Sequence, residues 1–115
     1  MDIENKKGNT LIAESAEIAT LVDYQSSTVV SRTIIERNVG SVTLFASDKG
    51  QGLSEHTAPF DALVYVLDGE VDITINGQSI RLKASEAIIM PANKPHALKA
   101  LEKFKMMLVM VRDKK

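Results

Sequence analysis

The sequence contains no cysteine, and this absence excludes a whole group of chemistries. Disulfides, thiolate metal sites and cysteine nucleophiles all need a thiol. A chain without disulfides also fits a reducing compartment. Histidine is nearly as scarce, because only His56 and His96 are present. Imidazole chemistry is therefore restricted to two positions, and both lie between residues 51 and 100.

The chain also lacks an excess of charge and a long apolar run. Its formal net charge is −1 at pH 7, so no overall field attracts nucleic acid or an anionic membrane. No apolar run approaches the roughly 20 residues that span a bilayer, and the first residues, MDIENKKGNT, lack the apolar core of a signal peptide. No glycine-rich phosphate loop, nucleophile elbow or basic-aromatic surface is present. We therefore expect a cytoplasmic protein with no nucleic-acid or membrane partner.

The length of 115 residues fits one domain. We expect an N-terminal arm over residues 1–20 and a folded domain over residues 21–115. Within the arm, residues 11–21 (LIAESAEIATL) have a weak helical rhythm. The pattern supports a short helix and an extended arm equally.

From residue 28 onward the chain reads as β structure. Residues 28–35 are rich in β-branched side chains, and residues 41–46 and 70–75 alternate polar and apolar. Asn76-Gly77 predicts a tight hairpin, because both central residues of that turn need positive φ. Residues 62–67 and 87–90 are continuously apolar, which predicts strands buried on both faces. The expected strands cover residues 28–35, 41–46, 53–58, 62–67, 70–75, 79–83, 87–90, 96–101 and 104–111. This pattern predicts an all-β sandwich or barrel.

Two groups of residues resemble the sequence motifs of the cupin superfamily. In the first, Gly50 stands six residues before His56, and Gly69 closes the motif. In the second, Pro91 is followed by Asn93 two residues later and by His96 three residues after that, with a serine where the family has its first glycine. The resemblance covers about residues 35–111. It implies a double-stranded antiparallel β-barrel of the jelly-roll kind, and it implies a homodimer.

The resemblance also implies a metal site, but the ligand set is incomplete. In metal-binding cupins, two first-motif histidines, a glutamate and the second-motif histidine hold one divalent ion. The second histidine position is Ala58 here, and the glutamate position, counted back from Gly69, is Ala62. His56 and His96 remain, and a metal held by them needs a third protein ligand.

Asp61 is the candidate third ligand. It precedes the vacant glutamate position, so strand parity directs it outward unless a bulge in residues 58–60 re-aims it. With that ligand, the barrel would hold one divalent iron, manganese, nickel, copper or zinc ion. Family resemblance then implies dioxygenase, isomerase or decarboxylase chemistry, although whether the chain is an enzyme stays open.

The alternative is a metal-free barrel that binds or senses a small organic molecule, because two alanines in place of ligands enlarge the cavity. Either hypothesis places the histidines in the pocket. Met90, Met106, Met107 and Met110 fit both pocket lining and core packing. Phe60 and Tyr65 fit a stacking platform for a ligand, a dimer surface or the core. The residues predicted to line the pocket are Ser54, Ala58, Ala62, Val64, Met90 and Leu98.

Overall fold

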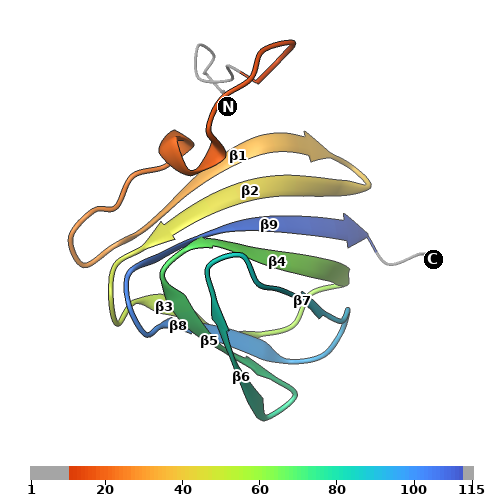
Figure 1. Ribbon diagram of the computed structural model, residues 1–115. Coiled ribbons are helices and arrows are strands. Elements are labelled where there is room, and N and C mark those ends of the chain that lie inside the picture. Colours follow the sequence, from red (N-terminus) through yellow and green to blue (C-terminus); the bar gives the residue numbers. More distant parts are fainter. Residues whose placement is uncertain (1–10, 113–115) are drawn as a thin grey trace.

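Two antiparallel β-sheets face each other in the computed structural model, which describes residues 11–112 (Figure 1). One sheet has five strands in the order β1-β2-β9-β4-β7, and the other has four in the order β3-β8-β5-β6. The strands are β1 (Val29–Arg37), β2 (Gly40–Ser47), β3 (Gly52–His56), β4 (Phe60–Asp68), β5 (Glu70–Ile75), β6 (Gln78–Lys83), β7 (Ala87–Met90), β8 (His96–Ala100) and β9 (Phe104–Arg112). This confirms the all-β jelly-roll prediction.

The hairpin between β5 and β6 has the predicted geometry. Asn76 and Gly77 take φ values of 51° and 85°, as the tight turn requires. The two strands then pair in register from Ile75↔Gln78 to Glu70↔Lys83. Since residue parity is fixed by this turn, Val71 and Ile73 both face the interior and are fully buried.

The core fills the space between the two sheets. Its largest fully buried side chains include Phe104, Ile73, Met106 and Val64, which come from strands of both sheets. Burial of this continuous apolar layer is the main stabilising contribution in a two-layer β fold. The same layer forms the floor of the pocket described below.

Two strands predicted to be buried on both faces are buried on one face only. In β4, Ala62 is buried and Leu63 is 37% exposed, and in β7, Met90 is buried and Ile89 is 62% exposed. The reason is that residues 11–112 cover only part of the outer face of the five-stranded sheet. That prediction was therefore wrong for the outward-facing residues.

The N-terminal segment provides this partial cover. Between residues 11 and 28 it contains one short 3-10 helix, η2 (Ile18–Leu21), which lies within the stretch 11–21 where a short helix or an extended arm was predicted. Side chains of the five-stranded sheet hold the backbone of η2: Arg32 Nη1 donates to the Leu21 carbonyl at 2.9 Å, and Lys105 Nζ donates to the Ala19 carbonyl at 2.6 Å. Val22, which follows η2, packs with Leu44 and Ala46 of β2 in a second apolar cluster, the outer cluster. Within residues 11–112, no helix is long and apolar enough to cross a bilayer.

Candidate functional site

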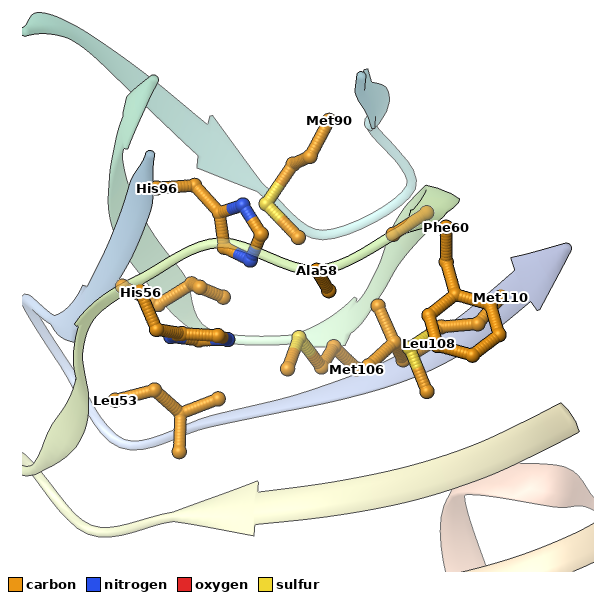
Figure 2. Close-up of a pocket in the computed structure, with 11 residues that line it drawn as sticks. Leu53, His56, Ala58, Phe60, Met90, His96, Met106, Leu108 and Met110 are labelled. Carbon is orange, nitrogen blue, oxygen red and sulfur yellow. The ribbon is translucent and has the colours of Figure 1, made fainter. Parts of the chain in front are cut away.

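A pocket of about 40 Å³ lies between the sheets, at one end of the core (Figure 2). On the same measure one water needs roughly 10–15 Å³, so the pocket has room for an ion or a ligand of a few non-hydrogen atoms. Its wall is apolar except for two imidazole rings. The lining residues are Leu53, His56, Ala58, Phe60, Ala62, Met90, His96, Leu98, Met106, Leu108 and Met110.

The two histidines are brought together by strand pairing. His56 ends β3, His96 begins β8, and the two residues are direct partners in the antiparallel ladder. Their ring centroids are 4.4 Å apart and their planes are inclined at 69°. His96 is buried at 6% exposure while His56 is exposed, so the pair spans from the interior to the surface of the pocket.

The backbone fixes which ring nitrogen of each histidine is free. His56 Nδ1 lies 2.8 Å from the Ser54 carbonyl oxygen, and His96 Nδ1 lies 3.2 Å from the Lys94 carbonyl oxygen. A carbonyl only accepts hydrogen bonds, so Nδ1 carries the proton in both rings. In the neutral rings Nε2 therefore keeps a lone pair, available to a hydrogen-bond donor or a metal.

The environment of His96 favours its neutral form. Burial lowers the pKa of His96 below its usual range, and the neighbouring His56 lowers it further, while the bond to the Lys94 carbonyl acts in the opposite direction. At neutral pH the buried ring of His96 is thus a hydrogen-bond acceptor at Nε2 rather than a cation.

Asp61 lies outside the pocket, contrary to its prediction as the third metal ligand. Its side chain is exposed on β4, and Oδ1 accepts a hydrogen bond of 2.9 Å from the Ala92 amide. The neighbouring Asn93 amide donates to the Ala58 carbonyl at 2.8 Å. Together these bonds hold the loop before His96 against the start of β4, so Asp61 positions that loop.

Four of the six residues predicted to line the pocket do so, namely Ala58, Ala62, Met90 and Leu98. The two vacant ligand positions, 58 and 62, therefore face the same space as the histidines. Val64 lies deeper and is fully buried in the core. Ser54 is exposed, and Leu53 takes the lining position in its place.

A β-bulge accounts for the exchange of Ser54 for Leu53. Leu53 pairs with Leu98 and His56 with His96, so three steps along β3 match two steps along β8. The extra residue reverses the parity of β3 upstream of His56. A bulge was expected at residues 58–60, but the irregularity lies between Leu53 and His56.

Sequence reasoning also missed part of the β9 contribution to the wall. Met106, Leu108 and Met110 line the pocket at every second residue, while Met107 packs in the outer cluster beside Leu44. Period-2 alternation in β9 separates these two sets, but a strand that is apolar on both faces does not reveal which set faces inward.

The donor set does not fit the divalent metal site that the resemblance implies. Among residues 11–112, no three His, Cys, Asp or Glu side chains are placed to hold one ion. Divalent iron, manganese and zinc sites use at least three protein ligands drawn from imidazoles, carboxylates and thiolates. The pocket wall offers two imidazoles and no third ligand of these kinds.

Comparison with known proteins identifies relatives of this fold and sequence. A family model described as "Cupin domain" matches residues 43–112. A conserved protein of unknown function from Streptococcus pyogenes is 36% identical, with a TM-score of 0.88 over 93% of this chain and 94% of that chain. A cupin superfamily protein from Desulfitobacterium hafniense is 28% identical, with a TM-score of 0.86 over 91% of this chain and 96% of that one.

A cupin 2 conserved barrel domain protein from Leptotrichia buccalis is 39% identical, with a TM-score of 0.80. The alignment covers 82% of this chain and 46% of that chain, so this chain matches about half of the longer protein. No curated protein matches the chain significantly.

Proposed function

The chain belongs to the cupin family, and we propose that its barrel binds a small molecule at the histidine pair. One observation carries the proposal: the pocket wall is apolar except for two imidazoles that lie 4.4 Å apart between centroids. An apolar cavity with a few convergent polar groups is the usual form of a ligand site. The polar groups orient the ligand, and the apolar wall excludes water from it.

The free Nε2 atoms define the chemistry that fits. A neutral imidazole with its proton on Nδ1 accepts a hydrogen bond at Nε2. The matching ligand is a small molecule that presents hydroxyl protons to the histidines and an apolar body to Phe60 and Leu98. The pocket volume of about 40 Å³ limits this ligand to a few non-hydrogen atoms unless the methionine side chains move.

We favour binding over catalysis because the wall has no acid–base group besides the imidazoles. General acid–base chemistry on a small substrate normally uses one group that donates and another that accepts. Burial lowers the pKa of His96, so at neutral pH this ring accepts at Nε2 and is not an acid. A sensor or carrier role needs only binding.

The proposal is tested by thermal unfolding of chelator-treated protein with a panel of short hydroxy acids and alcohols. A ligand that prefers the folded state raises the melting temperature, and we expect a rise of roughly 4 °C or more at saturation. His56→Ala should abolish the rise, whereas Lys99→Ala, on the exposed face of β8, should keep it. A ligand that stabilises both variants equally would contradict binding at the histidines.

We further propose that a second copy of the chain covers the bare part of the five-stranded sheet. The exposed apolar side chains on strands of this sheet are Ile35, Leu63, Ile89 and Val111, and Val39 is exposed in the turn between β1 and β2. A net charge of −1 also gives two copies little reason to repel. A self-complementary apolar face fits a two-fold dimer.

Analytical ultracentrifugation tests this interface. Ile89 is 62% exposed, so Ile89→Lys should leave the fold intact. It should raise the dimer dissociation constant at least tenfold and so convert the dimer to monomer. Ile12→Lys is the matched control, because Ile12 is 73% exposed on the N-terminal segment. A monomeric wild-type protein, or a dimer insensitive to Ile89→Lys, would refute the interface.

A further inference from the structure

The pocket holds sulfur as well as nitrogen donors. Three of the five methionines in the chain, Met90, Met106 and Met110, line it. Met90 and Met106 are buried at 2% and 1% exposure. Figure 2 shows their sulfur atoms directed toward the histidine rings, while Met110 lies at the far end beside Phe60. The wall therefore presents thioethers and imidazoles to one small space.

The donors come from both sheets. His56 and His96 project from β3 and β8 of the four-stranded sheet, and Met90 and Met106 project from β7 and β9 of the five-stranded sheet. The register fixes each of them: Met90 pairs with Ala62, and Met106 pairs with Val66. Two rigid sheets thus place two nitrogen and two sulfur donors on opposite walls of the pocket.

We propose that this pocket is a copper(I) site, with Nε2 of His56 and His96 and the thioether sulfurs of Met90 and Met106 as its ligands. The inference rests on the proposed role of this pocket as the binding site, although it does not depend on an organic ligand. Thioether sulfur is a soft donor that favours Cu(I), and imidazole also binds copper well. No other residue type on the wall donates to a metal.

Charge supports a monovalent ion. The four proposed ligands are neutral, and no carboxylate lines the pocket to offset a charge of +2. Transfer of an ion into an apolar cavity is costly, and the cost rises with the square of the charge, so a singly charged ion is the better match. The hydrogen bonds from Nδ1 to the Ser54 and Lys94 carbonyls orient both rings for Nε2 ligation.

The experiment is anaerobic competition between the full chain and the chromophoric Cu(I) chelator bicinchoninate, with ascorbate present. We expect one Cu(I) per chain. Met106→Leu and Met90→Leu conserve side-chain volume, and each should weaken Cu(I) binding at least tenfold. Met107→Leu is the matched control, because Met107 is adjacent in β9 but packs in the outer cluster, and its affinity should stay within twofold of wild type.

X-ray absorption at the copper edge gives a second readout. Wild-type protein should show sulfur and nitrogen scatterers, and Met106→Leu should lose part of the sulfur contribution. No Cu(I) binding, a nitrogen-only spectrum, or equal effects of Met106→Leu and Met107→Leu would overturn the proposal. Each of these results leaves the organic-ligand assay on chelator-treated protein unaffected, so failure of the copper site and failure of small-molecule binding are distinguishable.

Discussion

Replacement of Gly69 by alanine should destabilise the fold by roughly 3–5 kcal/mol, a large fraction of the about 5–15 kcal/mol that holds a small domain together. Gly69 connects β4 in one sheet to β5 in the other, and its φ is +80°. An alanine Cβ at this position would collide with the backbone carbonyl oxygen of Lys103. Backbone atoms next to β9 cannot move aside cheaply, so steric overlap adds to the strain of a left-handed residue.

Gly50→Ala separates these two costs. Gly50 has nearly the same φ, +84°, but a Cβ there would meet nothing within 4 Å. Gly50→Ala should therefore lower the free energy of unfolding by only about 1 kcal/mol, which is the strain of an L residue in the left-handed region. Urea unfolding of both variants measures the difference in free energy of unfolding. Equal losses at the two positions would show that close packing at Gly69 contributes nothing.

Much of the fold is predictable because its signals are local. Alternation in residues 70–75 and the Asn76-Gly77 turn determine the β5–β6 hairpin without help from the rest of the chain. Family motif spacing then predicts that residues 56 and 96 meet, and they are direct partners in the β3–β8 ladder. At Ser85, where the family has glycine, the backbone still takes a φ of 76°, so the turn survives the substitution.

The errors arise where tertiary context decides. The β3 bulge is not visible in the sequence, because the extra residue shows only when β8 is paired beside it, and it exchanges Ser54 for Leu53. Exposure of Leu63 and Ile89 depends on how far the N-terminal segment extends over the sheet. The placement of Asp61 depends on the amide of Ala92 in a loop about thirty residues away in sequence.

Restoring the two vacant ligands should create a divalent metal site in this barrel. Ala58 and Ala62 line the pocket together with His56 and His96, so Ala58→His with Ala62→Glu supplies three imidazoles and one carboxylate to the same space. The carboxylate offsets the charge of a divalent ion and provides the hard oxygen donor that the native wall lacks. We expect near-stoichiometric manganese, nickel or zinc and at least a 100-fold gain in affinity over wild type, measured by titration and metal analysis.

The stability of this double variant should depend on metal. Position 62 is only 4% exposed, so an unliganded glutamate there loses hydration and lowers the free energy of unfolding. Metal binding pairs the carboxylate and should raise the melting temperature, an effect that EDTA reverses. Ala58→His with Leu63→Glu is the matched control, because residue 63 faces outward at 37% exposure. If the control gains the same affinity and stabilisation, positions 58 and 62 do not converge with the histidines on one ion.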